Sequence, residues 1–444
     1  MTKSGNSLFN ISKFLVLIFF TSVRFVDAGD AGTKVYTIDE SIREALENNW
    51  GVKVKKEKIE ESQFVKKQAK ADFMPKVSAT YGYTRLDEVR RSTATIFSPA
   101  RDLNDQNNYR LKGSITQPLF TGYALTSAYE LAKLGIDQSE VNLELEKLNL
   151  AFKIKDAYFN ILKADKAVDV VKDAVESLKS HLKVASNFYE VGMIPINDLL
   201  KAEVELSNAR HNLIKAQNAS QLTRAAFNMH LSRPINSPVN VEDILVYKPE
   251  LPDFNKYFSK ALEKRPEIKV LNINSLQIDK QILLAKSKYY PEIALTYNYI
   301  KEGDGPDVSG SDFHDSNSWQ VVAGLSWTLW NWKKTEYSIR EKESLKRQLI
   351  QTQKTFEDSI ALELKRAILD LQEAEKNIPN AKKAVEQSEE NLRVSEERYK
   401  AQVTTSTEVL DAQTLLTQAK VNYYSALYDH HLAKAALMRA VGEY

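Results

Sequence analysis

This 444-residue chain carries one sequence unit written twice, and the duplication constrains its fold more than any other feature. Identical residues recur at a spacing of 216 early in each copy and at a spacing of 210 later on. The matched pairs include Ala45 with Ala261, Pro75 with Pro291, Tyr81 with Tyr297, Ala157 with Ala367, and Tyr189 with Tyr399. The change of spacing implies one deletion in the second copy. Because deletions collect in exposed loops, residues 84–108 and 300–318 are expected to be equivalent loops.

The N-terminus predicts a secretory signal peptide over residues 1–28. Lys3 and Lys13 flank an otherwise uncharged start, a short apolar run follows at 14–20, and Val26-Asp27-Ala28 has the small-x-small pattern of a cleavage site. The apolar run is too short for a membrane-spanning helix, which needs about 20 apolar residues. No other stretch approaches that length, so any part of this chain that enters a membrane is expected to do so as strands.

The rest of the chain is expected to form two structural repeats joined by a linker. The first repeat covers residues 29–232 and the second covers residues 253–444. The linker, residues 233–252, contains four prolines and therefore cannot be helical throughout. Both repeats predict the same order of elements: helix, strand, loop, strand, long helix, turn and return helix.

Two strands are predicted in each repeat, at about 76–84 and 109–118 in the first and at about 292–300 and 319–329 in the second. Apolar and polar residues alternate along them, as expected for strands with one apolar face. Their length, about 9–11 residues, is what a tilted membrane-spanning strand needs. An ordinary soluble hairpin with one buried face would show the same pattern, so the strands alone leave both interpretations open.

The segments after the strands predict long coiled-coil hairpins, at about 124–232 and 335–441. Large residues recur every seven positions on the second long helix: Leu371, Ile378, Val385, Leu392 and Tyr399. Alanine and serine fill the second seam position, which lets helix backbones approach closely. The predicted fold class is therefore mainly α with a β membrane part, built from a duplicated helix–strand–strand–long helix–helix unit.

Four strands per chain cannot form a closed barrel, and open sheet edges are not tolerated in hydrocarbon. Small membrane barrels have at least about 8 strands. If the strands cross a membrane, several chains must therefore share one barrel, and the long helices must extend about 100 Å away from it. Aromatic residues at the strand ends suit a membrane–water interface. They are Phe120, Tyr123, Trp327, Trp330 and Trp332.

Composition and motifs exclude several classes of function. Lys and Arg number 61 against 59 Asp and Glu, a balance that argues against nucleic-acid binding. The chain has no cysteine, so it has no thiolate metal site and no cysteine nucleophile. No nucleotide-binding or metalloprotease signature is present, and the six histidines form no metal-ligand pattern. No enzyme activity, metal or cofactor is therefore expected.

The sequence resembles the TolC-like outer-membrane efflux proteins over about residues 37–442. The resemblance is strongest where each long helix turns back, around Phe188–Leu200 and Tyr399–Ala412, and at Pro118-Leu119-Phe120. It implies a homotrimer with a 12-stranded β-barrel in outer-membrane lipid, continued by a 12-helix periplasmic barrel. It also implies docking to a periplasmic adaptor and an inner-membrane pump, and localisation in the outer membrane of a Gram-negative-type cell.

The resemblance further implies a constriction at the turn between the long and return helices. Glu408 and Asp411 match acidic residues that ring the periplasmic aperture in this family, and Asp198 and Tyr399 match residues that hold it closed. Thr404 stands where some members have an arginine that joins this lock, which leaves the arginine-based lock in doubt. Without the resemblance, Glu408 and Asp411 would read as solvated acids near a helix N-terminus.

Two functions from different classes follow. The first is a passive outer-membrane exit duct of a tripartite efflux or type I secretion system. The alternative is a soluble periplasmic coiled-coil scaffold or adaptor without a pore. Two equivalent hairpins and strands with aromatic ends favour the duct, and the sequence does not name the transported substrate.

Overall fold

A computed structural model describes residues 35–244, 249 and 252–444, and within this range the chain is mainly helical, as predicted. The first copy comprises β1 (Val35–Tyr36), α1 (Ile38–Asn48), α2 (Trp50–Ala71), β2 (Lys76–Arg85), β3 (Asn107–Phe120), α3 (Ala124–Glu190) and α4 (Ile196–His230). The short strand β4 (Asn240–Val241) lies within the predicted linker and pairs with β1. The second copy comprises α5 (Phe254–Lys264), α6 (Pro266–Lys286), a short 3₁₀ turn, β5 (Glu292–Gly303), β6 (Ser318–Ser326), α7 (Lys334–Lys400) and α8 (Ser406–Val441). The predicted signal peptide and part of the predicted linker lie outside the described residues.

The duplication is visible element by element, because α3 and α7 have 67 residues each and begin 210 positions apart. The helix starts follow from local chemistry. The Thr37 side chain accepts from the backbone N–H of Glu40, whose carboxylate accepts from the N–H of Thr37 in return, which is a capping box. In the second copy Asp253 caps α5 by accepting from the N–H of Asn255 at 2.9 Å.

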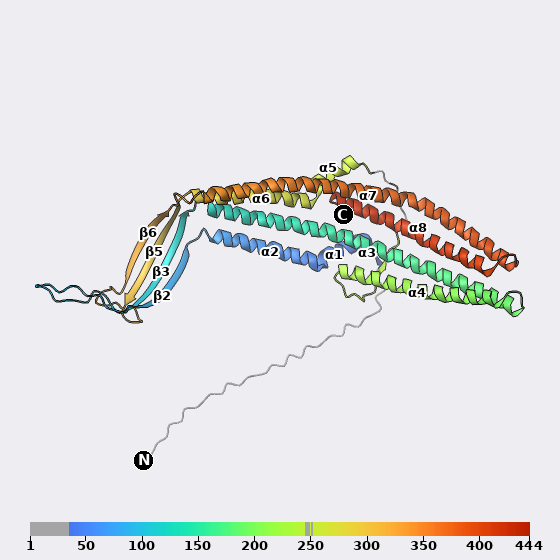
Figure 1. Ribbon diagram of the computed structural model, residues 1–444, viewed down its shortest axis with the longest axis horizontal. Helices are drawn as coiled ribbons and strands as arrows, with labels where there is room; N and C mark the ends of the chain where they lie inside the picture. The colour runs from blue at the N-terminus through green and yellow to red at the C-terminus, as the bar shows by residue number, and fades with distance from the viewer. Residues whose placement is uncertain (1–34, 245–248, 250–251) are drawn as a thin grey trace, which may run out of the picture.

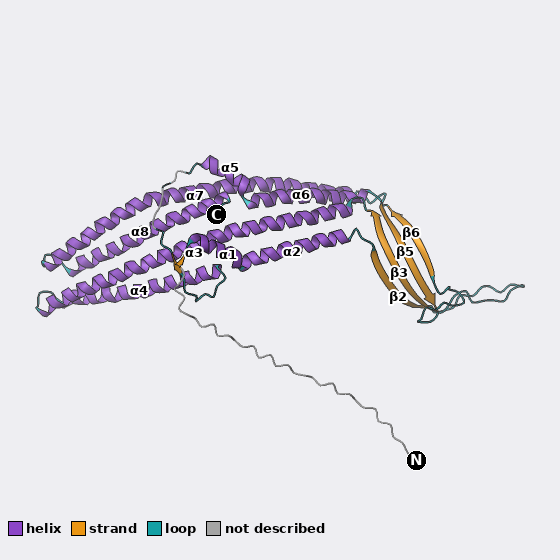
Figure 2. Ribbon diagram, turned by 180° about the vertical axis from the view of Figure 1, so that it is seen from behind, coloured by secondary structure: helices purple, strands orange, loops and turns teal. Residues whose placement is uncertain are grey.

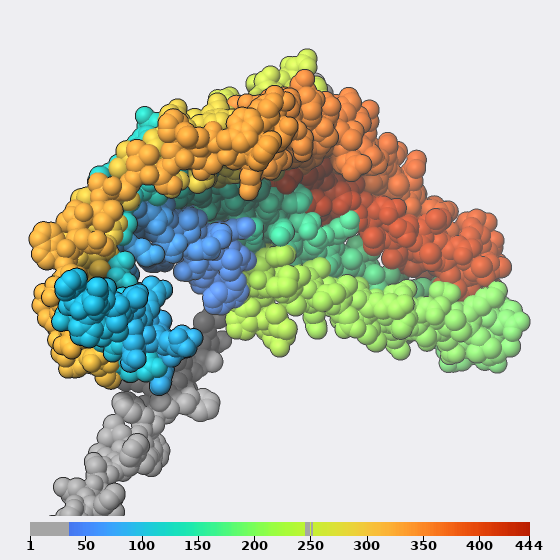
Figure 3. All heavy atoms as spheres, turned by 60° about the vertical axis from the view of Figure 1, so that its left-hand side comes forward, coloured from blue at the N-terminus to red at the C-terminus, as the bar shows by residue number. Residues whose placement is uncertain are grey.

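The helices form one curved wall. Its length is about 100 Å, because α3 and α7 each have 67 residues and a helix rises 1.5 Å per residue. α2 and α4 lie end to end along one side of α3, and α6 and α8 lie end to end along its other side (Figure 1). α7 packs beyond α6 and α8, so it forms one edge of the wall, while α2 and α4 form the other. Figure 3 shows that the wall is hollowed on one side.

The core lies where the short helices cross the long ones. In the first copy Tyr158, Phe227 and Ile154 are fully buried between α1, α3 and α4. The Tyr158 hydroxyl donates to the backbone oxygens of Tyr36 and Glu242, so the chain segments on either side of the first repeat are tied together.

The second copy adds a buried ion network at the equivalent junction. Arg265, whose side chain is 3% exposed, donates to Glu363 at 2.7 Å and to Glu267 at 3.0 Å. Arg439 reaches the same two carboxylates. Although burial alone would raise the pKa of Glu267, the hydrogen bond from Arg265 lowers it. The network therefore fixes α6 against α7 and α8.

The four long strands form one antiparallel sheet in the order β2-β3-β5-β6, at one end of the helical wall (Figure 2). No described helix covers either face of this sheet. Its apolar side chains are therefore exposed: Val77 is 74%, Trp319 is 68% and Leu325 is 65% accessible. β2 and β6 are the two edges, and neither edge has a partner strand among the described residues.

The observed strand β6 is shorter than the predicted strand 319–329. It ends at Ser326, which pairs with Glu292, and the next partner in the ladder would be Pro291. Proline has no backbone N–H to donate, so the ladder stops there and Trp327–Leu329 leave the sheet. Among the described residues, no helix combines the length and apolar character needed to span a bilayer.

Candidate functional site

The two helix turns farthest from the sheet lie side by side and bring the residues of the predicted aperture to one end of the molecule (Figure 1). Asp198 lies in the first turn of α4, and Tyr399 lies in the last turn of α7. Glu408 lies in the first turn of α8, and Asp411 lies one turn further along. A spacing of three residues places Glu408 and Asp411 on neighbouring positions of one helix face.

The Glu408 carboxylate is held by two neighbours within its own hairpin. Arg398, in the last turn of α7, donates Nη1–H to Oε1 at 2.7 Å. The Thr404 hydroxyl donates to the other oxygen, Oε2. Both oxygens are therefore occupied, and the α7–α8 turn is clamped by an arginine that the sequence interpretation did not include.

Asp411 is exposed and takes part in no ion pair within the described part of the chain. It lines a groove of about 670 Å³ between α4 and α8, together with Lys201, Glu205 and Thr407. Lys201 spans this groove, because its Nζ donates to the Thr407 hydroxyl at 3.2 Å and lies 4.0 Å from Asp198. Asp411 is thus the less compensated of the two predicted aperture acids.

A buried polar cluster joins the first hairpin to the second beside this end. Tyr399 is 3% exposed, and its ring lies 4.9 Å from the His181 ring and 5.6 Å from the Phe188 ring, centroid to centroid. His181 Nε2 lies 2.8 Å from the hydroxyl oxygen of Ser406, the first residue of α8. Below the cluster, the Ser177 hydroxyl donates to the Gln413 side chain at 2.6 Å.

Burial dominates the electrostatics of this cluster. It lowers the pKa of His181 to about 4, so the imidazole is neutral at neutral pH. Burial also raises the pKa of Tyr399, and the negative charge of Asp198 raises it further. The Tyr399 hydroxyl does not reach Ser406 or Asp198 in good hydrogen-bonding geometry within the described chain.

The predicted interface aromatics gather at the helical end of the sheet. Phe120 and Tyr123 pack edge to face at 5.7 Å, and both also contact Tyr290. The rings of Trp330 and Trp332 lie 6.0 Å apart, and Trp327 donates its indole N–H to the backbone oxygen of Tyr289. Tyr289 and Tyr290 were missed, although their position directly before Pro291 marks the same junction.

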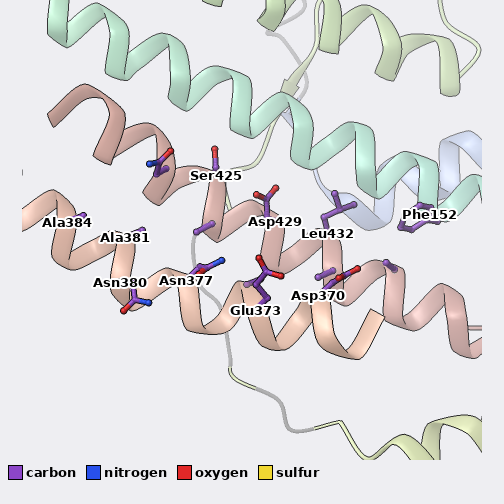
Figure 4. A pocket seen from close by; sticks show the side chains of 15 residues that line it. Phe152, Asp370, Glu373, Asn377, Asn380, Ala381, Ala384, Ser425, Asp429 and Leu432 are labelled. Atoms are coloured by element: carbon purple, nitrogen blue, oxygen red, sulfur yellow. The ribbon is translucent and has the colours of Figure 1, made fainter. Parts of the chain in front are cut away.

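A second groove, of about 750 Å³, follows the seam between α7 and α8 (Figure 4). Alanines lie along both helices, and Phe152 of α3 closes one end. The charged lining residues are all acidic: Asp370, Glu373 and Asp429, of which Asp429 already pairs with Lys163 at 3.0 Å. Small residues allow a partner helix to approach the backbone closely, and the acids favour a basic one.

Within the described residues, no group of three or more histidine and carboxylate side chains could hold a metal ion. His430 and His431 are adjacent on α8, but their rings are nearly perpendicular at 81°. His431 stacks on Phe159, whereas His430 lies 3.6 Å from Glu375, so the two histidines have different surroundings. The geometry thus supports packing roles for both.

Two further residues of the tip were missed because their roles depend on tertiary contacts. His181 lies outside the heptad seam of its own hairpin, and it is buried only because the second hairpin covers it. Arg398 reads as one of many exposed helix charges, and its partner Glu408 is ten residues away across a turn. A basic residue in the last helical turn is the one local signal.

Comparison with known proteins places this architecture in a family. The sequence profile of the outer membrane efflux protein family matches residues 41–228 and 257–443, one match in each repeat. The chain is 22% identical to the outer membrane protein TolC of Escherichia coli over 374 residues, 77% of this chain and 71% of TolC. It is 21% identical to the outer membrane efflux protein BepC of Brucella suis, over 84% of this chain and 78% of BepC.

Solved structures agree on the fold. The Campylobacter jejuni CmeC outer membrane channel superposes with a TM-score of 0.76 at 17% identity, covering 91% of this chain and 85% of CmeC. Because the family profile matches both repeats over most of their length, the predicted mainly helical fold and outer-membrane localisation are confirmed. The chain belongs to the outer membrane efflux protein family.

Proposed function

We propose that this protein is a passive, non-catalytic exit duct that works as a homotrimer. The proposal rests mainly on one observation: both the sheet and the helical wall of the protomer have two free edges. β2 with α2 and α4 forms one edge, and β6 with α7 forms the other. Edges of different composition that meet head to tail generate a ring when the rotation closes.

Three protomers would supply 12 strands, enough for a closed membrane barrel, whereas one supplies four. Closure of the barrel would pair the outward-facing N–H and C=O groups of the edge strands β2 and β6. Such pairing is needed in the hydrocarbon core of a membrane, where no water can bind unpaired backbone groups. The uncovered apolar side chains of the sheet would then face lipid outside the barrel. This surface disfavours the alternative of a soluble periplasmic scaffold, since such a sheet would expose its apolar face to water.

The same ring would extend the helical wall into a tunnel and bring three copies of the tip together. Glu408 and Asp411 would then surround a narrow periplasmic aperture, with Tyr399 and Asp198 among the contacts that hold it closed. We further propose that a periplasmic adaptor packs a basic helical surface into the acidic α7–α8 groove and joins the duct to an inner-membrane pump. We infer that the energy for transport would come from that pump, since the sequence of the duct contains no nucleotide-binding signature.

The decisive experiment is reconstitution. Purified in mild detergent, the protein should have the mass of a trimer and should form ion-conducting channels in planar bilayers. A stable monodisperse monomer without conductance would overturn the proposal. Recovery of the protein only in the soluble periplasmic fraction of cells would favour the scaffold instead.

A further inference from the structure

One of the two predicted aperture acids, Glu408, is paired with an arginine, so the tip differs from a simple ring of carboxylates. Arg398 and Glu408 form a direct ion pair at 2.7 Å, with side chains 49% and 43% exposed, so both still face solvent. The Thr404 hydroxyl fixes the second carboxylate oxygen. Two groups, the Arg398 guanidinium and the Thr404 hydroxyl, thus orient the Glu408 carboxylate, and its charge is matched by a guanidinium that stays protonated at any physiological pH.

We propose that Arg398 is a specificity-determining residue, which masks Glu408 and leaves Asp411 as the acid that sets cation preference at the aperture. The inference rests on the proposed trimeric duct. Each protomer then contributes a neutral Arg398–Glu408 pair and one Asp411 that forms no ion pair with any described residue. A trimer presents three effective carboxylates near its axis, where an arrangement without Arg398 would present six.

The Arg398–Glu408 ion pair is expected to affect the electrostatic potential of the pore more than the stability of the fold. An ion pair between half-exposed side chains contributes little to folding stability, about 0–1 kcal/mol. The potential in a narrow pore depends instead on net charge, because rings of Asp or Glu attract cations and offer oxygen ligands to divalent ions. Removing Arg398 should therefore change ion selectivity far more than it changes stability.

The test is a double-mutant cycle in planar bilayers at low salt, with cation-over-anion permeability as the readout. Arg398→Gln should raise the cation preference at least about threefold and strengthen block by Mg²⁺, since Glu408 is unmasked. Glu408→Gln should lower the preference, since Arg398 is unmasked instead. The double variant Arg398→Gln/Glu408→Gln should restore the wild-type ratio, because it removes a neutral pair.

Arg393→Gln is the matched control. Arg393 lies on the same helix and pairs with Glu390 and Glu397, so it has a similar exposed ion-pair environment away from the turn. It should leave selectivity unchanged. If Arg398→Gln has no effect and the double variant behaves like Glu408→Gln, the masking assignment is wrong.

Asp411→Asn separates this inference from the proposed function. It should abolish most of the cation preference if the α8 acids line the aperture. Loss of preference in Asp411→Asn together with an unchanged Arg398→Gln channel would reject only the masking. An Asp411→Asn channel with wild-type selectivity would instead reject the acidic aperture itself.

Discussion

At the scale of single residues, the two helix turns at the tip differ at one position, where glycine stands in the first copy and glutamine in the second, yet both residues have the same left-handed backbone conformation. Gly192 follows α3 with φ +77°, and Gln402 follows α7 at the equivalent place with φ +60°. The left-handed conformation suits glycine because it has no Cβ, whereas other L-residues pay about 1–2 kcal/mol for it. The second turn therefore keeps the geometry of the first under backbone strain.

Gln402→Gly is expected to stabilise each protomer by about 1 kcal/mol, because it removes this strain while the turn geometry stays the same. Thermal unfolding of the purified protein measures the change. Gly192→Ala is the matched control with the opposite sign, since no atom lies within 4 Å of the added Cβ and only the conformational cost acts. Equal midpoints for both variants and the wild type would contradict the strain argument.

At the scale of elements, the two hairpins of one protomer are joined near the tip by His181, which bridges from α3 to Ser406 of α8. A cavity of about 40 Å³ beside it is lined by Glu396, Tyr399 and Lys400. The imidazole must be neutral to stay buried there, because a charged group in this site would lose its hydration. The contact between the hairpins is therefore sensitive to acid.

The sign of the pH dependence follows from the pKa of His181, which burial lowers to about 4 from an ordinary 6.5. Between these values the unfolded chain binds a proton that the folded chain does not. The stability of the contact is therefore fully present above pH 6.5 and is lost as pH falls toward 4, on the order of 3 kcal/mol in total.

Resting conductance in bilayers at pH 7.5 and pH 5 measures this effect. Wild-type channels should open more at pH 5, and His181→Gln, which keeps an uncharged polar group, should show a smaller acid response. His431→Gln is the control, because burial also lowers the pKa of His431 to about 4, but this residue stacks on Phe159 and lies away from the tip. An equal acid response in all three proteins would exclude His181 as the sensor.

At the scale of the whole molecule, the proposed duct requires that both edges of the sheet be paired. Neighbouring residues of a strand point their N–H groups to opposite sides, so only one of Val321 and Val322 donates toward β5. In an open sheet, proline should be tolerated at the other of the two positions. In a closed barrel, proline at either position removes a ladder hydrogen bond.

Val321→Pro and Val322→Pro should therefore both impair trimer assembly, measured as the yield of trimer extracted from outer membranes. Val321→Ala and Val322→Ala keep the N–H groups and should assemble normally. If one proline variant assembles as well as its alanine counterpart, that edge of β6 is unpaired and the barrel does not close as proposed.

Much of this architecture is determined by the sequence itself, because it depends on local or periodic signals. The offset between the two copies predicted equivalent helices. The heptad seam through Leu371 and Leu392 predicted the hairpin, and the capping box of Thr37 and Glu40 predicted a helix start. Hydrophobic periodicity and capping act over a few turns and need no knowledge of the fold. The matched family profile then agreed with these features.

Tertiary structure decided the chemistry of the tip and the end of the sheet. The pairing of Glu408 with Arg398, the burial of His181 by the second hairpin, and the stop of β6 opposite Pro291 each join residues on different elements. No local pattern carries such information. An exposed charge, a histidine outside the heptad seam and the end of a strand have the same sequence signal whether or not a partner residue faces them. Only the packing of the two repeats against each other brings those partners into contact.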